Sequence, residues 1–303
     1  MPELPEVEVV RRGLEPRTVG RTITALEVLD LRIIRRQRGG EDRLRAALVG
    51  STLSAVVRRG KFLWWRLADA DGAEAGEALM GHLGMSGQLR VSTADAAVAA
   101  PAAPSEGPAS DPLRHRRLSL HLDDGARVDL IDQRLFGGLW TSPLVEAADG
   151  ALLPEDATHI ARDLLDSAID LPGVARALRA RRSAIKSLLL NQEIVSGIGN
   201  IYADEALWAA RTRFDTPGIA LSQRRALSIL RAARDVMERA LEMGGTSFDA
   251  LYVNVDGRSG YFARSLHAYG KDGDPCDRCG TLVVRVRFMN RSSFFCPACQ
   301  RRR

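Results

Sequence analysis

The four cysteines of the chain all lie near its C-terminus, in two pairs with the spacing of a metal site. Cys276 and Cys279 form one C-x-x-C pair, and sixteen residues separate it from a second pair, Cys296 and Cys299. A C-x-x-C turn directs two thiolates at one point, and two such turns at the tips of a hairpin complete the tetrahedron that Zn²⁺ accepts. The spacing predicts one zinc ion, with an iron–sulfur cluster as the less common alternative. Four protein ligands leave no open position, so the metal is expected to be structural.

The N-terminus offers a candidate nucleophile. Pro2 follows Met1, and a small second residue favours removal of the methionine, which would leave a free secondary amine. An α-amino group has a pKa of about 7.7–8.0, against about 10.4 for lysine, so more of it is unprotonated at neutral pH. Attack of this amine on a sugar C1′ would give a cationic iminium, an electron sink that promotes loss of the 3′ phosphate.

Two acids follow the candidate nucleophile. Glu3 could protonate the sugar ring oxygen or relay protons at the leaving base. Glu6 could hold the amine, or it could only complement the dipole of a helix that starts here. A Pro-Glu start is a weak signal by itself.

The elements before residue 149 have the pattern of a β-rich domain. A short amphipathic helix is expected after Pro5, with Val7, Val10 and Leu14 on its apolar side. Strand-like runs follow at 23–29, 52–57, 62–67, 88–92, 117–122 and 127–131, and the turn at 123–125 predicts a hairpin between the last two. These strands indicate a sandwich or barrel-like sheet. Residues 68–77 and 93–112 have the composition of surface insertions, and we expect the second to be disordered.

The pattern becomes helical from residue 152 to residue 243. Helices are expected at 174–190, 201–210 and 222–243, and the third ends at Gly244-Gly245. Gly197 and Gly199 flank a tight turn before Asn200, where exposed N–H groups and the Asn200 amide could bind a phosphate. An ordinary helix corner with Asn200 as the N-cap is the alternative.

The charge distribution and the composition indicate which kind of partner the protein binds and where in the cell it acts. The net charge is only +5, but residues 270–303 hold eight Lys or Arg against three Asp, and residues 171–192 hold five with no acid. Two basic blocks suit a polyanion that touches both, although two solvated surfaces would give the same pattern. No apolar run could span a bilayer and the N-terminus has no signal-peptide pattern, so we expect a cytoplasmic protein.

Six short motifs are spread over nearly the whole length of the chain. They are Pro2-Glu3-Leu4-Pro5-Glu6-Val7-Glu8, Arg58-Arg59-Gly60-Lys61-Phe62, His82-Leu83-Gly84-Met85-Ser86-Gly87, Asp132-Gln133-Arg134-Leu135-Phe136-Gly137, Gly197-Ile198-Gly199-Asn200-Ile201-Tyr202 and the cysteine segment with Asn290-Arg291-Ser292-Ser293-Phe294-Phe295-Cys296. In this order they resemble the formamidopyrimidine-DNA glycosylase family, the 8-oxoguanine DNA glycosylases.

The resemblance implies a bifunctional DNA glycosylase and abasic-site lyase of base excision repair. Such an enzyme excises oxidised purines through a Schiff base on its N-terminal proline, followed by β,δ-elimination. The implied α+β multidomain fold has a catalytic β-sandwich over 1–148 and a helix–two-turn–helix domain over 149–245. Residues 246–303 would hold a lesion-capping loop at 246–262 and a zinc-finger hairpin. The implied partner is damaged double-stranded DNA, bound by a monomer associated with the nucleoid.

The resemblance also assigns residues. Pro2 would be the nucleophile and Glu3 the proton donor, with Lys61 acting in β-elimination and Arg291 in δ-elimination. The DNA contacts carried over are His115, Arg134, Arg182, Lys186 and Asn200, together with Met85 and Phe136. Met85 and Phe136 could fill the gap that an extruded base leaves in the stack, while Arg134 bonds the orphaned partner base.

The sequence differs from the family pattern at some positions, and two other functions are alternatives to this interpretation. The family's common Asp-Pro-Arg motif has Gln133 in place of the proline here, and Leu135 removes a phosphate contact. The 93–112 insertion, which precedes His115, is longer than the usual linker of the family. Within the fold, an endonuclease VIII-like enzyme for oxidised pyrimidines is the close rival. In another class, a DNA-binding zinc protein without catalysis is the alternative, and on its own the zinc hairpin could equally bind protein.

Overall fold

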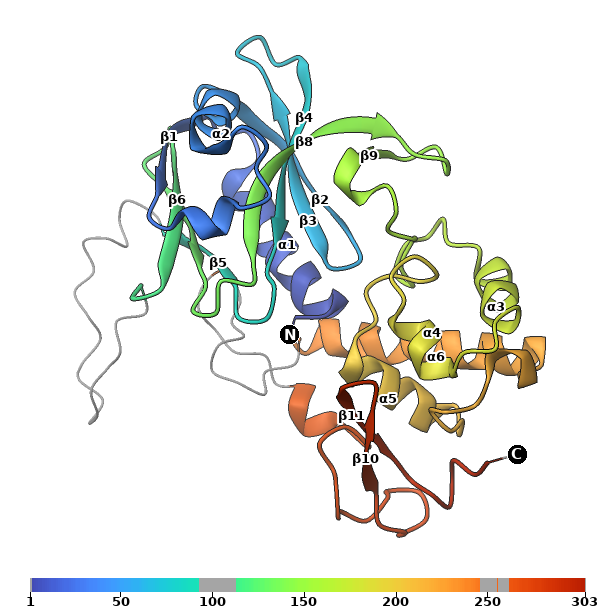
Figure 1. Ribbon diagram of the computed structural model, residues 1–303. Helices are drawn as coiled ribbons and strands as arrows, with labels where there is room; N and C mark the ends of the chain where they lie inside the picture. The colour runs from blue at the N-terminus through green and yellow to red at the C-terminus, as the bar shows by residue number, and fades with distance from the viewer. Residues whose placement is uncertain (1, 93–112, 246–254, 256–261, 303) are drawn as a thin grey trace, which may run out of the picture. The chain divides into compact units, whose positions relative to one another are not determined.

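The computed structural model describes residues 2–92, 113–245, 255 and 262–302 (Figure 1). Two compact units make up the chain: a β unit of residues 1–2, 6–158 and 247–259, and a helical unit of residues 3–5, 159–246 and 260–303. The insertion expected at 93–112 lies outside the described residues, as does the loop expected at 246–262 apart from residues 255 and 262. Among the described residues, no helix combines the length and the apolar character needed to cross a bilayer.

Two antiparallel sheets form the β unit, in the orders β1-β6-β7-β5 and β2-β3-β4-β8-β9. Their strands are β1 (Ile23–Val28), β2 (Thr52–Arg59), β3 (Phe62–Ala68), β4 (Glu74–His82), β5 (Gln88–Ser92), β6 (Arg116–Leu122), β7 (Arg127–Ile131), β8 (Gly138–Glu146) and β9 (Leu152–Pro154). Side chains from both sheets share one apolar core, which confirms the predicted sandwich. The hairpin predicted at 123–125 joins β6 to β7.

Helix α1 (Leu4–Thr18) contributes Val7, Val10 and Leu14 to this core, as their three- and four-residue spacing predicts. The short helices η1 (Leu31–Ile34) and α2 (Gly40–Leu48) were not expected. The prediction of an insertion over 68–77 is wrong at its end, because β4 already begins at Glu74. The Asp69 carboxylate accepts hydrogen bonds from the N–H groups of Asp71 and Ala73, which closes a tight β3–β4 turn in place of a long loop.

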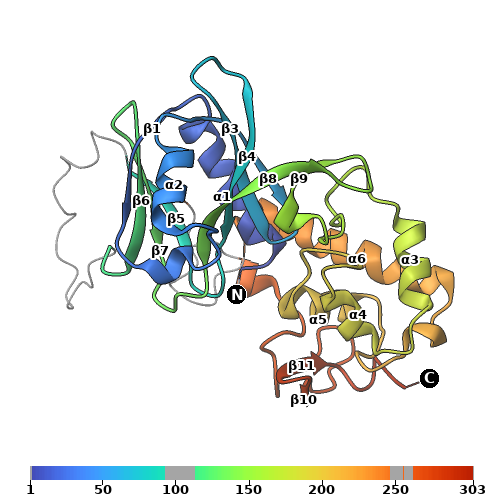
Figure 2. The same ribbon diagram turned by 45° about the horizontal axis from the view of Figure 1, so that its top comes forward.

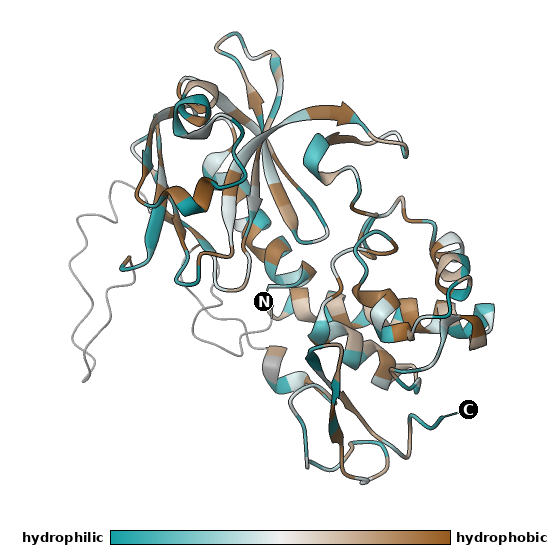
Figure 3. Ribbon diagram, in the orientation of Figure 1, coloured by the Kyte–Doolittle hydropathy of each residue, from teal (hydrophilic) through white to brown (hydrophobic). Residues whose placement is uncertain are grey.

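The helical unit contains α3 (Leu171–Arg179), α4 (Ile185–Leu190), α5 (Asn200–Ala209) and α6 (Gln223–Glu242). Figure 2 shows α6 running alongside α5, and Figure 3 shows the hydrophobic residues distributed along these helices. The apolar face predicted for α6 is buried, apart from half-buried Leu241. Ser222 caps the helix by accepting the Arg225 N–H, and the backbone turns at Gly244 and Gly245 with φ of 76° and 87°.

The single helix predicted over 174–190 is wrong. Helix α3 ends at Arg179 and α4 begins at Ile185, because the chain between them pairs with residues 216–219. The Ile185 N–H donates to the Thr216 carbonyl at 2.7 Å, and the Gly218 N–H donates to the Ser183 carbonyl at 3.0 Å. These tertiary hydrogen bonds take the place of helical ones.

A β-hairpin carries the second half of the cysteine segment. Strands β10 (Val284–Phe288) and β11 (Arg291–Phe295) pair across a two-residue turn, Met289-Asn290, whose φ angles of 47° and 58° are those of a type I′ turn. Figures 1 and 2 both show the hairpin beside α5, and residues of β11 contact that helix. The short helix η5 (Phe262–Ser265) precedes the hairpin in the chain.

Candidate active site

The carboxylate of Glu3 is held at the N-terminus of helix α5. Its oxygens accept hydrogen bonds from the N–H groups of Gly199 at 2.6 Å, Ile201 at 2.9 Å and Tyr202 at 3.4 Å. The side chain is 2% exposed. Three N–H donors and the positive end of the helix dipole favour a charged carboxylate here. The residue that follows Pro2 in the chain is therefore fixed in place by the helical unit.

The two glycines before Asn200 make room for the N-terminal segment. A Cβ at Gly199 would lie 2.3 Å from the Glu3 Cδ, and one at Gly197 would lie 2.5 Å from the Leu4 Cδ1. The Leu4 N–H also donates to the Gly197 carbonyl at 3.0 Å. The sequence-based prediction of exposed N–H groups that bind a phosphate is therefore wrong, since Glu3 occupies this helix start.

Asn200 is not the N-cap of α5. Gly199 holds that position, and Asn200 is the first helical residue. Its amide instead donates to the Ser292 carbonyl at 3.0 Å. The half-buried Asn200 side chain thus joins α5 to strand β11.

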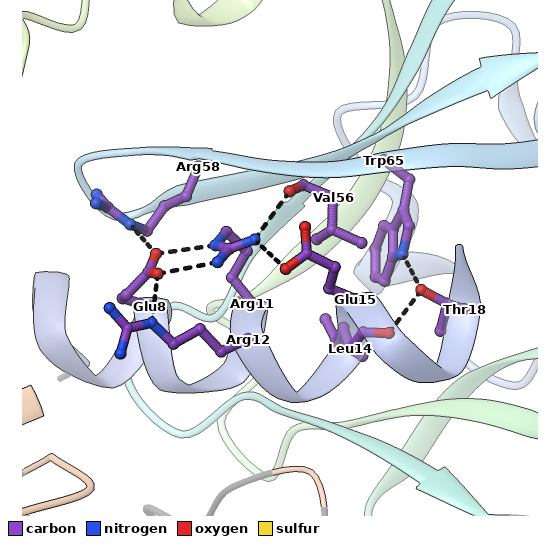
Figure 4. A network of polar contacts seen from close by, with 9 residues as sticks. All are labelled: Glu8, Arg11, Arg12, Leu14, Glu15, Thr18, Val56, Arg58 and Trp65. Carbon is purple, nitrogen blue, oxygen red and sulfur yellow. Dashed lines mark hydrogen bonds and ion pairs between the residues drawn. The ribbon is translucent and has the colours of Figure 1, made fainter. Parts of the chain in front are cut away.

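Lys61 lies in the two-residue turn between β2 and β3, directly after Gly60, whose φ is 58°. The side chain is 8% exposed. Arg58 fixes this turn, because its Nη1 donates to the Gly60 carbonyl at 2.9 Å while its Nε donates to the Glu8 carboxylate at 3.0 Å. Glu8 belongs to α1, so the turn that carries Lys61 is bound to that helix (Figure 4).

Glu8 is the centre of a charged network along α1 (Figure 4). Its carboxylate accepts hydrogen bonds from Arg11, Arg12 and Arg58 at 2.9–3.1 Å. Burial alone would raise the pKa of Glu8, but Arg11 and Arg58 lower it below its ordinary value. The ion pairs of this network are charged throughout the physiological range.

His82 is neutral at physiological pH. Burial lowers its pKa from 6.5 to about 4, and the positive charges of Arg36, Lys61 and Arg35 add to the effect. Its Nδ1 accepts a hydrogen bond from the Gly84 N–H at 3.1 Å. A neutral imidazole avoids further repulsion of Lys61 and fixes the start of the loop that carries Met85.

The structure brings Met85, Arg134 and Phe136 together on two loops that pack against each other. A Cβ at Gly84 would lie 2.4 Å from the Phe136 carbonyl carbon, so only glycine fits where the loops cross. Met85 is 37% exposed and Phe136 48% exposed, and the Arg134 guanidinium lies 5.1 Å from the centre of the Phe136 ring. Two large apolar side chains exposed together are available for an interaction outside the chain.

Asp132, a residue outside the predicted site, connects these loops. Its fully buried carboxylate accepts hydrogen bonds from Ser86 Oγ at 2.6 Å, the Gly137 N–H at 2.7 Å and the Arg134 N–H at 3.1 Å. The Asp132 N–H donates to the carbonyl of half-buried His115 at 2.9 Å. His115 therefore lies at the base of the same loops.

Arg35 holds the second loop from the other side. It donates to the carbonyl oxygens of Leu135, Phe136 and Gly137 at 2.8–3.1 Å. Leu135 has a φ of 55°, a conformation that costs a non-glycine residue energy, and these hydrogen bonds offset that cost. The backbone of Leu135 thus helps to present Phe136.

Lys186 and Arg291 approach each other through strand β11. Arg291 is exposed at the first position of this strand. The next residue, Ser292, accepts hydrogen bonds on its carbonyl from Lys186 Nζ and from the Asn200 amide, each at 3.0 Å. Three predicted site residues are thus joined within the helical unit.

Asp204 completes this attachment of β11. Its carboxylate accepts hydrogen bonds from Ser293 Oγ at 3.0 Å and the Phe294 N–H at 2.9 Å, and it forms an ion pair with Lys186 at 2.7 Å. Burial raises the pKa of Asp204 to about 6, although Lys186, Phe294 and Ser293 all lower it. Burial likewise lowers the pKa of Lys186, and Asp204 opposes that shift.

The prediction that Lys186 contacts DNA directly does not fit its burial. The side chain is 0% exposed, and its ammonium group is surrounded by Asp204 and the Ser292 carbonyl. Arg182, by contrast, is exposed in the break between α3 and α4. Pro2 is buried and Glu6 is half-buried.

Sequence reasoning also missed Glu205, which accepts hydrogen bonds from the N–H groups of His267, Ala268 and Tyr269 at 2.8–3.0 Å. The signal was present in the sequence. Asp204 and Glu205 interrupt an otherwise apolar run from residue 201 to residue 208, and buried acids require partners.

The four cysteines form the predicted cluster. Their sulfur atoms all lie within 4.8 Å of one another, and none takes part in a disulfide. Four thiols at this separation fit one tetrahedral Zn²⁺ with no position for substrate. Trp208 of α5 donates its indole N–H to Cys276 Sγ at 3.4 Å, which connects the metal cluster to the helix that Glu3 caps.

Family models cover most of the chain. They match residues 1–139 as the formamidopyrimidine-DNA glycosylase N-terminal domain, 160–251 as the H2TH domain of the same glycosylases, and 273–302 as the zinc finger found in FPG and IleRS. The formamidopyrimidine-DNA glycosylase of Corynebacterium glutamicum is 51% identical over 100% of both chains. The chain belongs to the formamidopyrimidine-DNA glycosylase family.

Other members of the family agree with this assignment. The formamidopyrimidine-DNA glycosylase of a Nocardioides species is 52% identical over 99% of this chain and 94% of its own length. The Lactococcus lactis Fpg, solved with DNA that contains an abasic site, has a TM-score of 0.78 at 29% identity over 99% of this chain and 100% of its own. Family membership makes the chain a zinc-containing DNA glycosylase of base excision repair with lyase activity at abasic sites.

Proposed function

We propose that this glycosylase excises oxidised purines, 8-oxoguanine and formamidopyrimidines, from double-stranded DNA by attack of the Pro2 amine on C1′ of the damaged nucleotide. The attack forms a carbon–nitrogen bond and breaks the glycosidic bond, and the base leaves with a proton. The C1′–O4′ bond then breaks as the ring oxygen takes up a proton, which gives a ring-opened iminium between Pro2 and C1′. This iminium loses a proton from C2′, and the 3′ phosphate departs in β-elimination. A second elimination then releases the 5′ phosphate.

The observation that carries this proposal is the anchoring of the N-terminal segment. An N-terminal acid normally extends into water, yet the Glu3 carboxylate is buried and receives three backbone N–H donors. Anchoring the residue next to Pro2 restricts the amine to one geometry, and a nucleophile gains most when it is positioned in advance.

The environment of Glu3 also supports its role in proton transfer. The three N–H donors hold the Glu3 carboxylate in one position. We propose that Glu3 accepts a proton as the Pro2 amine becomes nucleophilic and then delivers it to the sugar ring oxygen. Glu6, in the first turn of α1, is proposed to support the amine.

The remaining site residues are proposed to act either in the elimination steps or in DNA binding. We propose that Lys61 acts in β-elimination and Arg291 in δ-elimination, both with phosphate contacts. His115, Arg134, Arg182 and Asn200 are the proposed polar contacts to DNA, and Met85 and Phe136 fill the space of the extruded base. Lys186 acts on DNA only through strand β11.

We further propose that the enzyme works as a monomer in the cytoplasm, associated with the nucleoid. Its functional division would follow 1–148, 149–245 and 246–303.

Borohydride trapping tests the proposed nucleophile. The protein with a processed N-terminus, mixed with a duplex that contains 8-oxoguanine opposite cytosine, should give a covalent protein–DNA adduct on reduction. A form that retains Met1 should give none, since its Pro2 nitrogen is an amide. An undiminished adduct from that form would overturn the proposal.

Excision, nicking and duplex-binding measurements distinguish the alternative functions. Faster excision of thymine glycol than of 8-oxoguanine would favour an endonuclease VIII-like enzyme. Salt-sensitive duplex binding without nicking at abasic sites would mean a binding protein without catalysis.

A further inference from the structure

The helical unit contains a basic pocket beyond the C-terminal end of helix α5. Its volume is about 420 Å³, and its walls include Arg211, Arg213, Arg224, Arg225 and Arg301 together with Thr212. None of its lining residues is acidic. Asn200 begins α5 and Arg211 follows its end, so a helix of ten residues, or about 15 Å, separates the pocket from the proposed DNA contact.

The pocket is positively charged because the segment that forms most of it contains many arginines and few acids. Residues 206–234 contain six arginines and a single acid, Asp215. Arg213 and Arg302 form ion pairs with Asp215 at 2.9 Å and 2.8 Å. Within the described residues, Arg211 and Arg224 are exposed and form no ion pair.

The N-terminus of α6 adds to the positive potential. Ser222 lines the pocket and is the N-cap of this 20-residue helix, whose first turn contains no acid. Arg224 and Arg225 occupy that first turn, where the helix dipole favours negative charge. Two cations at this position lower the stability of the helix unless an anion binds beside them.

Arg211 is a second residue near the pocket whose position lowers the stability of the fold. It has a φ of 49° just after α5, at a position where glycine is the relaxed choice. Arg225 stabilises this turn by donating to Thr212 Oγ1 at 2.8 Å and to the Arg211 carbonyl. Residues that destabilise the local structure and line the same cavity are typical of a functional site.

We propose that this pocket is a second anion site, which binds a ligand that carries two or more adjacent phosphate groups. Guanidinium groups bind phosphate oxygens through paired charge-assisted hydrogen bonds, and helix N–H groups bind them end-on. The volume accommodates a compact anion. The phosphates come either from the backbone of a second nucleic-acid segment or from a free phosphate compound.

Calorimetric titration with inorganic pyrophosphate tests the site. The full-length, zinc-loaded protein is first saturated with a duplex that contains an uncleavable abasic-site analogue, so that the proposed DNA contacts are occupied. Pyrophosphate should still bind, and the zinc content should not change. Absence of binding at low ionic strength would overturn the proposal.

Two substitutions remove guanidinium groups without a threat to folding. Arg211→Gly relieves the positive φ, and Arg224→Gln removes a cation from the start of α6, so neither should lower the unfolding temperature. Each should weaken pyrophosphate binding about tenfold. Excision from a short damaged duplex should not change, because neither residue belongs to the proposed catalytic machinery.

The matched controls are Arg231→Gln and Arg239→Gln, single substitutions at exposed positions of α6 outside the pocket. Each removes one positive charge, as Arg211→Gly and Arg224→Gln do, and should leave pyrophosphate binding within about twofold. An equal loss in the controls would reduce the proposal to general attraction by a basic protein. Displacement of pyrophosphate by an excess of undamaged duplex identifies nucleic acid as the source of the phosphates, and its retention identifies a free phosphate compound.

Discussion

The close contact between Gly199 and Glu3 is the most sensitive point of the site at the scale of single residues. Replacing Gly199 with alanine would put a methyl group 2.3 Å from the Glu3 Cδ, and the carboxylate would have to leave the start of α5. We expect Gly199→Ala to reduce the single-turnover rate of base excision by at least about 100-fold, the usual contribution of a positioned acid.

The variant Glu3→Gln distinguishes the role of Glu3 in holding the N-terminal segment from its role in proton transfer. The amide keeps one oxygen that can accept from the helix start, so the N-terminal segment should remain in place while proton transfer is lost. Both variants should bind a duplex with an abasic-site analogue nearly as tightly as the parent enzyme. Normal excision by Gly199→Ala would show that the position of Glu3 does not matter.

His82 makes the stability of the β unit depend on pH. Its pKa is lowered from 6.5 to about 4, so folding favours the neutral ring. This contribution is fully present above pH 6.5 and is lost as the pH falls through 4. We expect the free energy of unfolding to fall by about 2–3 kcal/mol over that interval from this residue.

Urea unfolding at several pH values measures this effect. The variant His82→Asn places an uncharged acceptor where Nδ1 receives the Gly84 N–H, so its stability should change less between pH 6.5 and 4. The other acidic groups titrate alike in both proteins. Parallel curves for the two proteins would contradict the assignment.

At the scale of elements, the buried pair of Lys186 and Asp204 attaches β11 to helices α4 and α5. Lys186→Met leaves an uncompensated carboxylate and should cost about 3–5 kcal/mol of stability. Asp204→Asn in addition removes that charge but keeps an acceptor for the Phe294 N–H, so the double variant should be more stable than Lys186→Met alone. Chemical denaturation measures both differences.

The same pair should influence the reaction through Arg291. Because Lys186 bonds the carbonyl of the residue after Arg291, the double variant should yield more β-elimination product relative to δ-elimination product. Arg182→Gln, which removes an exposed cation in the break between α3 and α4, should weaken DNA binding and leave the product ratio unchanged. An unchanged ratio in the double variant would show that Arg291 is positioned independently of this pair.

The difference between sequence and structure is greatest where tertiary contacts replace local ones. The strands β1, β2, β3, β5, β6 and β7 and the helices α1 and α6 were predicted from periodicity, whereas β4, β8 and β9 were not expected. The division of 174–190 into two helices depends on pairing with residues 216–219, which no local pattern reports. Lys186 shows the same limit: a lysine in a basic helix indicates a surface, and only the position of Asp204 explains its burial.

The site itself was predictable to the extent that its residues lie in short motifs. Spacing alone identifies the cysteine cluster, and the motif glycines mark the positions where the chain approaches itself closely. Their partners were not predictable, because Gly199 meets a residue 196 positions earlier in the sequence. The helix start that suggested a phosphate site binds a carboxylate of the same chain.

At the scale of the whole molecule, separate cores predict that metal loss is a local event. The zinc cluster belongs to a small core with Trp208, Val283 and Phe294, whereas the β unit has a core of its own. Removing zinc should leave four thiols without a common ligand and loosen the β10–β11 hairpin together with Arg291. We expect the rate of nicking at abasic sites to fall by at least about 100-fold while the β unit stays folded.

Tryptophan fluorescence can follow the two units separately. Trp64, Trp65 and Trp140 are buried in the β unit, and Trp208, the fourth tryptophan of the chain, donates to Cys276 Sγ. Zinc removal should change the emission of Trp208 alone, and in a Trp208→Phe variant the spectrum should not respond to the metal. A zinc-dependent change in that variant would mean that the β unit also depends on the metal, because only its three tryptophans would remain to report. The metal would then stabilise both units, and its loss would remove Lys61 and the Met85 loop from their places along with Arg291.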